Sequence, residues 1–350
     1  MTVGRLQVAV AAPLKPEDAE YLQRAEPRID LAYEPDLLPL MRRAADYSGD
    51  PDWSRTAAQQ ARYAAMLDTA DALYGIPDVD SAALARTVRA NPRLRWVHTM
   101  AAGGGGQVKA ARLTADELER VTFTTSAGVH AGPLAEFAVF GVLAGAKNLG
   151  RLRSQQRAHE WGGRWTMGQV SEQTVLVLGL GGIGRVVAEK LHALGATVIG
   201  TSRRDVTLPG VDRVISPDRI GGVAGTVDAV INTLPGTDST EHAIGREFLN
   251  RLAPGATVVN VGRGTVIDES ALLEALESGV VGFAALDVFE AEPLATASPL
   301  WDRDDVLISP HTAALNDGEE RLIAELFASN ASKLLDGVPL ANTVNTIEFY

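Results

Sequence analysis

Three residues that could bind an acid and move a proton each follow a predicted strand in the second half of the chain. In order they are Arg263 after strand 256–260, Glu292 after strand 282–286, and His311 after strand 305–309. The carboxyl ends of parallel strands meet at one edge of a sheet, and ligands bind outside that edge. The spacing therefore predicts that these three side chains gather around a small ligand.

The three residue types suit chemistry at a carbonyl group beside a carboxylate. A guanidinium group binds a carboxylate through two parallel hydrogen bonds and polarises a neighbouring carbonyl. A carboxylate near a histidine favours the charged imidazolium, which can donate a proton near neutral pH. Arg263 is thus the candidate anion binder and His311 the candidate acid, with a solvated arginine and a structural histidine as the alternatives. We interpret the other five histidines as structural or surface residues: His98, His130, His159, His192 and His242.

A glycine-rich turn comes earlier in the same half of the chain. It follows the predicted strand 174–178, opens the predicted helix 182–194, and contains Gly179, Gly181, Gly182, Ile183 and Gly184. Glycines let the backbone approach a pyrophosphate, and a helix start offers free N–H groups and the positive end of its dipole. This context predicts a dinucleotide-binding turn, with a merely structural tight turn as the alternative.

The residues after the next predicted strand indicate which dinucleotide binds. NAD sites commonly have an acid about 20 residues after the glycines, which binds the ribose 2′-hydroxyl. Here the corresponding residues are Ser202, Arg203 and Arg204, and the first acid is Asp205. A hydroxyl and two guanidinium groups suit a 2′-phosphate. NADP(H) is therefore the predicted cofactor, and NAD(H) is the alternative if both arginines are only solvated.

Two series of alternating strands and helices must position these residues. The first has predicted strands at 6–10, 29–33, 72–76 and 94–99, and helices at 16–25, 57–66 and 80–90. The second has predicted strands at 174–178, 196–200, 211–215, 228–232, 256–260, 282–286 and 305–309, and helices at 182–194 and 269–278. Residues 132–157 and 319–335 are also helical by pattern, and Gly195 and Gly279 suit C-terminal caps. Such alternation predicts an α/β protein with two doubly wound parallel sheets.

Three sequence blocks resemble the signatures of the D-isomer-specific 2-hydroxyacid dehydrogenase family. In the family's order they are 260–268, 285–294 and 309–311. The resemblance implies that Arg263 binds the substrate carboxylate and carbonyl, that His311 is the acid and base, and that Glu292 is its partner. Glu290 lies in the same block, but the family's catalytic acid is the one that precedes the proline, which is Glu292.

The resemblance also implies a domain arrangement and further contacts. A Rossmann dinucleotide-binding domain, 128–314, would be inserted into a split flavodoxin-like substrate domain made of 1–127 and 315–350. Residues implied to lie along the cofactor are Leu234, Pro235, Val261 and, near the nicotinamide amide, Asp287. Residues that match the loop whose N–H groups bind the substrate carboxylate are Ala102, Gly103 and Gly104. The four consecutive glycines 103–106 depart from the family pattern, which leaves a plain flexible turn as the alternative.

Together these observations predict an oxidoreductase that moves a hydride between NADP(H), or NAD(H), and a small 2-oxo or 2-hydroxy acid with D specificity. Segments 201–203 and 298–301 are similar to the glyoxylate/hydroxypyruvate reductase branch. Formate dehydrogenases carry glutamine in place of Glu292, and phosphite dehydrogenases carry lysine in place of Ala102. Related transcriptional corepressors keep the same triad, so a dinucleotide-sensing binding protein with little turnover is the alternative. By the same resemblance, helix 132–147 is expected to form a homodimer interface.

Composition argues against several other classes. The 350 residues give room for two domains, and the net charge of −12 argues against nucleic-acid and anionic-membrane partners. The absence of cysteine removes disulfides and thiolate metal sites, and no metal site is predicted. No apolar run approaches the ~20 residues of a membrane span, so we expect a cytoplasmic protein.

Two features of the sequence call for a structural explanation. Ten of the 34 glycines lie in three segments expected to bring the backbone close to an anion: 103–106, 179–184, and 262 with 264. Residues 33–55 interrupt the strand–helix alternation with scattered Pro, Asp and Gly. A surface insertion, a lid and an oligomer contact are the alternatives for this segment.

Overall fold

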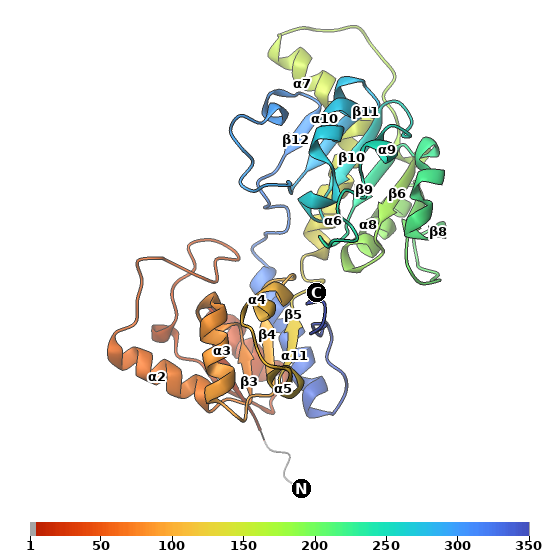
Figure 1. The fold of residues 1–350 in the computed structure, drawn as a ribbon. Helices are drawn as coiled ribbons and strands as arrows, with labels where there is room; N and C mark the ends of the chain where they lie inside the picture. The colour runs from red at the N-terminus through yellow and green to blue at the C-terminus, as the bar shows by residue number, and fades with distance from the viewer. Residues whose placement is uncertain (1–4, 350) are drawn as a thin grey trace. The chain divides into compact units, whose positions relative to one another are not determined.

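Residues 5–349 of the computed structural model form two units, each with its own parallel sheet and hydrophobic core (Figure 1). The first unit takes the chain up to His130 and the residues from Leu315 onward. The second unit is Ala131–Ala314. In the described part of the chain no helix is long and apolar enough to cross a membrane. The same residues contain no group of three or more His, Cys, Asp or Glu side chains that could hold a metal ion.

The first unit is built on a five-stranded sheet in the order β2-β1-β3-β4-β5, with all pairs parallel. Its strands are β1 Leu6–Val10, β2 Ile29–Ala32, β3 Ala72–Tyr74, β4 Trp96–Thr99 and β5 Thr122–Thr125. Its helices are α1 Pro16–Ala25, α2 Ala57–Asp68, α3 Ser81–Ala90, α4 Gly105–Ala110, α5 Ala115–Arg120 and α11 Glu319–Leu335. This strand order is that of flavodoxin-like folds.

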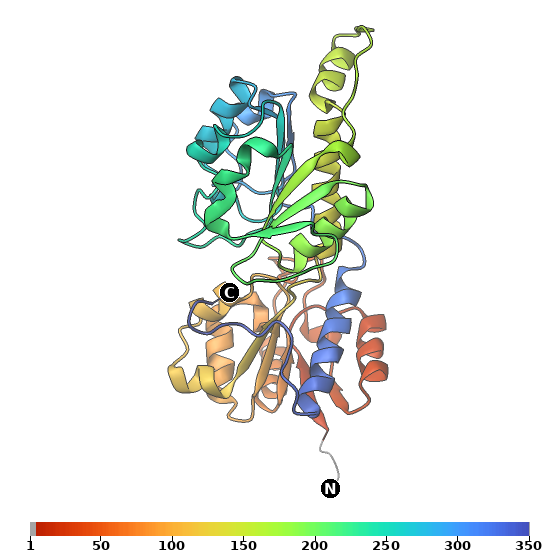
Figure 2. The ribbon, with the colours of Figure 1, turned by 90° about the vertical axis from the view of Figure 1, so that its right-hand side faces the viewer.

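Helix α11 completes the first unit from the far end of the chain. In Figure 2 it lies beside α1. Its Phe327 is fully buried and stacks on Trp96 of β4, with ring centroids 4.3 Å apart. The split of this unit around the second one therefore rests on direct aromatic packing between distant segments.

The second unit has a seven-stranded parallel sheet in the order β12-β11-β10-β9-β6-β7-β8. Its strands are β6 Thr174–Leu178, β7 Thr197–Thr201, β8 Arg213–Ile215, β9 Ala229–Asn232, β10 Ala256–Asn260, β11 Val281–Leu286 and β12 Val306–Ile308. Its helices are α6 Ala131–Ala146, α7 Leu149–Arg157, α8 Gly182–Ala193, α9 Arg246–Leu249 and α10 Glu269–Glu277. The order reverses between β6 and β9, which is the switch point where Rossmann folds bind dinucleotides.

Short 3₁₀ turns complete the secondary structure. They are η1 Pro35–Leu37, η2 Pro77–Val79, η3 Val170–Glu172, η4 Pro217–Gly222, η5 Ala224–Thr226, η6 Gly264–Val266 and η7 Pro299–Asp302. Helices on both faces bury the central strands of the second sheet. This burial explains why these strands read as continuous apolar runs rather than alternating patterns.

The structure confirms every predicted strand, with ends shifted by a few residues, and adds elements that the patterns did not predict. The helix expected over 132–157 is two helices, because Asn148 adopts a left-handed φ of 53° and caps α7 through the N–H of Arg151. The added strand is β5, and the added α-helices are α4, α5 and α9. Gly195 and Gly279 have φ of +88° and +75°, which confirms them as left-handed residues after α8 and α10.

Candidate active site

Three neighbouring strands, β10, β11 and β12, supply the three predicted catalytic side chains. Arg263 follows β10, Glu292 follows β11 and His311 follows β12. Nδ1 of His311 lies 2.7 Å from Oε2 of Glu292. The sequence predicted this pair, and the structure places both side chains at the surface of the second unit, 48% and 34% exposed.

The surroundings of Glu292 fix the orientation of the imidazole ring. The N–H of Phe289 donates to Oε1 of Glu292 at 3.0 Å, which leaves Oε2 for His311. An ionised carboxylate only accepts hydrogen bonds, so Nδ1 of His311 carries the hydrogen in this pair. Among residues 5–349, Nε2 of His311 has no hydrogen-bond partner. This nitrogen can therefore act on a ligand.

Asp287 anchors the turn that carries His311. Its carboxylate is 1% exposed, and Oδ1 accepts hydrogen bonds from the Ser309 hydroxyl at 2.6 Å and from the N–H groups of Thr312 and Ala313 at 2.9 and 3.0 Å. Its carbonyl oxygen accepts the N–H of His311 at 2.9 Å. His311 itself has a left-handed φ of 54°, which this network holds in place. The contact of Asp287 with a nicotinamide amide stays a prediction.

Arg263 lies on a loop that is packed between two others. A Cβ on Gly264 would overlap the carbonyl of Phe289, and one on Gly262 would lie 2.5 Å from the Leu234 carbonyl oxygen. The guanidinium is exposed and donates to the Gly262 carbonyl oxygen at 2.8 Å. Within the described residues it makes no ion pair, so its charge is available for an anion.

The glycine turn has the shape that a dinucleotide needs. Gly179 has φ +91°, and its N–H donates to Oγ1 of Thr201 at 2.8 Å. A Cβ on Gly184 would overlap the Gly179 carbonyl oxygen, so the helix start packs directly on the strand end. A Cβ on Gly181 would meet nothing within 4 Å. Gly181 and Gly182 are exposed at the N-terminus of α8, where the backbone offers free N–H groups.

The segment after β7 keeps its positive charge unpaired. Arg203 and Arg204 are exposed, and neither forms an ion pair within the described chain. The hydroxyl of Ser202 accepts the N–H of Arg204 at 3.0 Å and keeps its own hydrogen for another acceptor. Of the other residues expected along a cofactor, Leu234 and Ile183 are half-buried, Pro235 is exposed and Val261 is buried. These residues fit a phosphorylated dinucleotide.

A family model described as D-isomer specific 2-hydroxyacid dehydrogenase, NAD binding domain, matches residues 139–313, which is half of the chain. The chain belongs to this family. It is thus a nicotinamide-dependent 2-hydroxyacid dehydrogenase with its dinucleotide-binding domain in the second unit.

Individual relatives of this dehydrogenase agree with that assignment. Glyoxylate/hydroxypyruvate reductase B of Serratia proteamaculans (strain 568) is 34% identical over 211 residues, which cover 58% of this chain and 64% of that protein. The chain is also similar to an uncharacterized protein of the proB 3′ region of Corynebacterium melassecola, whose name states no activity: the two are 32% identical over 237 residues, which cover 66% of this chain and 77% of that protein. The crystal structure of a D-isomer specific 2-hydroxyacid dehydrogenase from Xanthobacter autotrophicus Py2, in complex with NADPH and MES, is 30% identical. It covers 99% of this chain and 100% of that one, with a TM-score of 0.73.

The first unit of the dehydrogenase holds the loop expected to bind a substrate carboxylate. Ala102 and Gly103 are exposed, and within residues 5–349 their N–H groups make no hydrogen bond. Gly104 is buried, and a Cβ there would overlap Oγ1 of Thr99. The glycine run then continues into α4, which starts at Gly105, so the alternative of a plain flexible turn is wrong for its second half.

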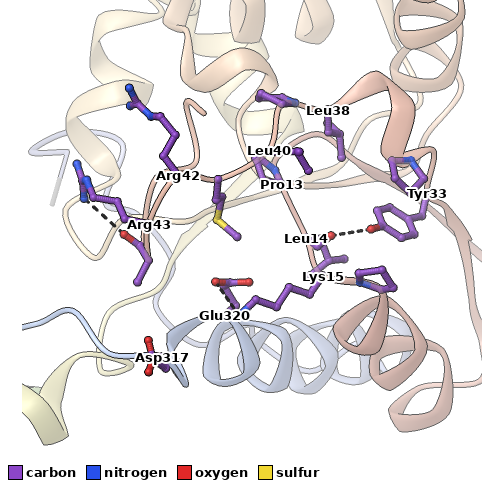
Figure 3. A pocket seen from close by; sticks show the side chains of 15 residues that line it. Pro13, Leu14, Lys15, Tyr33, Leu38, Leu40, Arg42, Arg43, Asp317 and Glu320 are labelled. Carbon is purple, nitrogen blue, oxygen red and sulfur yellow. Dashed lines mark hydrogen bonds and ion pairs between the residues drawn. The ribbon is translucent and has the colours of Figure 1, made fainter. Parts of the chain in front are cut away.

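The 33–55 segment builds a cavity of about 440 Å³ in the first unit (Figure 3). Its apolar walls include Leu38, Leu40 and Met41, and its polar lining includes Lys15 and Glu320. Nζ of Lys15 lies 3.3 Å from Oε1 of Glu320. Burial raises the pKa of the Glu320 carboxyl, and the lysine opposes that shift. The segment therefore supplies most of the residues that line this cavity.

Several residues that organise the site had no distinctive sequence signal. Thr201 holds the glycine turn, Ser309 holds Asp287, and His242 contacts Glu290 with Nε2 and Oε1 2.6 Å apart. Thr201 ends β7 and Ser309 opens the block 309–311, which are the only hints in the sequence, whereas His242 lies between β9 and α9, outside the three blocks. By contrast, His98 is buried in β4 between the hydroxyls of Thr124 and Ser126, and burial lowers its pKa to about 3, so it stays neutral.

Proposed function

We propose that this dehydrogenase is an NADP(H)-preferring reductase of small 2-oxo acids, of the glyoxylate/hydroxypyruvate type, which forms D-2-hydroxy acids. One observation carries the proposal. The 2.7 Å His311–Glu292 pair and the unpaired guanidinium of Arg263 follow neighbouring strands of the dinucleotide-binding domain. The 34% identity to a glyoxylate/hydroxypyruvate reductase B supports the substrate class.

The roles of the residues follow from their hydrogen-bonding capacity. Arg263 binds the carboxylate of the 2-oxo acid and polarises the adjacent carbonyl. When bound, the reduced nicotinamide supplies the hydride that adds to the carbonyl carbon. Nε2 of His311 donates a proton to the carbonyl oxygen as negative charge develops there, and Arg263 stabilises that charge. Glu292 holds the ring through Nδ1 and stabilises the imidazolium before the proton is transferred.

The preference for NADP(H) rests on Ser202, Arg203 and Arg204. Two exposed guanidinium groups without ion pairs within residues 5–349 suit the dianionic 2′-phosphate. The relative from Xanthobacter autotrophicus Py2 binds NADPH, which supports the same preference here. Dissociation constants for NADPH and NADH, measured by fluorescence titration, test it. A tenfold preference for NADH would contradict it.

The proposal extends to the first unit and to the assembly. Residues up to 127 and from 315 form the substrate domain, where the N–H groups of Ala102 and Gly103, with Gly104 shaping the loop, are a second candidate for binding the substrate carboxylate. The protein is a cytoplasmic homodimer in this proposal, with α6 at the interface. Phe140 of α6 is 47% exposed, which leaves an apolar side chain for a second copy to cover. Light scattering at the monomer mass would refute the dimer.

The decisive experiment replaces His311 by Gln. Turnover of glyoxylate or hydroxypyruvate with NADPH should fall by about 10²–10⁴-fold, because the general acid is lost, while the NADPH dissociation constant stays near normal. Pyruvate and phenylpyruvate, each with both cofactors, complete the substrate panel. Turnover of the variant within a few-fold of the unmodified enzyme would contradict the role of His311. Negligible turnover of the unmodified enzyme, with normal dinucleotide binding, would favour the corepressor-like alternative.

A further inference from the structure

His242 contacts both of the loops that carry Arg263 and Glu292. It lies between β9 and α9, outside the three signature blocks, and its side chain is 48% exposed. Its φ of 49° is left-handed, an unusual conformation for a residue with a side chain. Such strain persists only where surrounding contacts hold it, and it clusters at functional sites.

The backbone of His242 pairs with the segment that follows Arg263. Its N–H donates to the carbonyl oxygen of Thr265 at 2.9 Å, and the N–H of Ile244 donates to that of Val266 at 3.0 Å. The carbonyl oxygen of Ile244 also accepts the N–H of Asp268 at 3.2 Å, which completes an isolated parallel bridge between Ile244 and Ile267. The segment that starts two residues after Arg263 is therefore fixed to the chain around His242.

The ring of His242 holds the loop that carries Glu292. Nε2 lies 2.6 Å from Oε1 of Glu290, and the N–H of Glu290 donates to Oε1 of Glu269 at 2.6 Å. Phe289, next to Glu290, donates its N–H to Oε1 of Glu292 at 3.0 Å. The residues just before Glu292, Phe289 and Glu290, are thus held by hydrogen bonds.

The two loops also touch each other directly. Gly264 has no room for a Cβ because the Phe289 carbonyl occupies that space. A shift of the Glu290 segment would therefore be transmitted to the loop of Arg263 as well as to Glu292. Packed backbone contacts of this kind leave little freedom for independent adjustment.

We propose that His242 is a positioning residue of the dehydrogenase, and that its hydrogen bond with Glu290 sets the relative placement of Arg263 and Glu292. This inference rests on the proposed function, because it takes those two residues as substrate binder and histidine partner. An exposed histidine–carboxylate pair usually adds less than about 1 kcal/mol to stability. A large kinetic effect with a small effect on stability would therefore distinguish positioning from simple surface pairing.

Four variants test the inference in the full-length enzyme. His242→Asn keeps a residue type that tolerates a left-handed φ and shortens the side chain, and Glu290→Ala removes the other partner. The double variant of these two shows whether they act as one unit. Glu290→Gln keeps an oxygen acceptor for the histidine and serves as the conservative rescue. His192→Asn is the matched control, since His192 and Asp212 form a comparable exposed pair in the same unit, 3.7 Å apart, on α8 and before β8.

We expect kcat for the 2-oxo acid to fall by about tenfold in each of His242→Asn and Glu290→Ala, because sub-ångström misplacement of catalytic groups is costly. The double variant should lose no more than either single one, since both remove the same contact. Glu290→Gln and His192→Asn should stay within about threefold of the unmodified enzyme. The NADPH dissociation constant should change by less than twofold in every variant.

Three outcomes would overturn the inference. One is a kcat within twofold of normal in both single variants, whatever their melting temperatures. Another is a double variant whose loss of kcat is the product of the two single losses. The third is a loss of kcat in His192→Asn as large as that in His242→Asn. His311→Gln separates these failures from a failure of the proposed function: if it retains turnover, the proposed function is wrong. If it loses turnover while the His242 and Glu290 variants keep it, only the present inference is wrong.

Discussion

Two glycine-rich segments, one in each unit, use glycine in different ways. In the turn after β6, Gly179 has φ +91° and Gly184 has no room for a Cβ, while Gly181 faces open space. In the run after β4, a Cβ on Gly104 would overlap Oγ1 of Thr99, whereas a Cβ on Gly106 would meet nothing within 4 Å. No residue of 103–106 has a positive φ.

This difference shows that the function of a glycine-rich segment depends on the space around each glycine rather than on the number of glycines. In the turn after β6, three of the four glycines each meet a separate requirement: a left-handed residue, an open approach for a ligand, and close packing of helix on strand. In the run after β4, Thr99 requires a glycine at 104, Gly105 and Gly106 open α4, and Gly103 lies in the turn before it. Alanine substitutions test the contrast one position at a time.

Gly184→Ala should have the largest effect. The new methyl group would overlap the carbonyl oxygen of Gly179, a backbone atom that cannot move without displacing the turn. We expect the free energy of unfolding to fall by about 1–3 kcal/mol or more, as for other overpacked sites. The NADPH dissociation constant should rise by at least tenfold. Urea unfolding and fluorescence titration measure the two effects, and a stable variant with normal NADPH affinity would show that the close packing is not needed.

Gly181→Ala should affect binding more than folding. Its methyl group would meet no protein atom within 4 Å, and Gly181 is the N-cap of α8, where alanine is less favourable than glycine, so the free energy of unfolding measured in urea should fall by no more than about 1 kcal/mol. If the pyrophosphate approaches the start of α8 here, the methyl group occupies its space, and the NADPH dissociation constant should rise by about tenfold. Unchanged NADPH affinity would show that the dinucleotide does not approach this residue, whatever the result for Gly184→Ala.

The sequence predicted the strands well because buried parallel strands are continuous apolar runs with turn residues at their ends. It missed β5, whose Thr122–Thr125 run carries polar side chains that are satisfied inside the unit. Thr124, for example, accepts the indole N–H of Trp96 at 2.8 Å. It also missed the break between α6 and α7, because one residue with a left-handed φ, Asn148, leaves the helical pattern on both sides intact.

The positions of the candidate catalytic side chains were predictable because strand ends place them at one edge, but their supporting contacts were not. Asp287 was assigned to the cofactor by resemblance, and the structure shows its Oδ1 occupied by three donors from the His311 turn. The link between His242 and Glu290 joins residues 48 positions apart. Contacts of this kind depend on how loops pack after the strands are placed, and no local pattern encodes them.

Gly104→Ala tests the loop of the first unit. Its methyl group would overlap the hydroxyl of Thr99, a buried side chain that donates to the Ala101 carbonyl oxygen at 3.2 Å. We expect a loss of about 1–3 kcal/mol in the free energy of unfolding. The KM for the 2-oxo acid should rise severalfold if the N–H groups of Ala102 and Gly103 bind it, while the NADPH dissociation constant stays unchanged. A normal KM in a destabilised variant would show that this loop does not bind the substrate.

Gly106→Ala is the matched control and should have the smallest effect. Gly106 lies in the first turn of α4, has no positive φ and has open space where a Cβ would be. Alanine is a better helix former than glycine, so the free energy of unfolding should rise by about 0.5–1 kcal/mol. The KM for the 2-oxo acid and the NADPH dissociation constant should stay within twofold. If Gly106→Ala raises the KM as much as Gly104→Ala does, the open backbone of the whole run contributes to substrate binding, and the two glycine-rich segments are more alike than their geometry indicates.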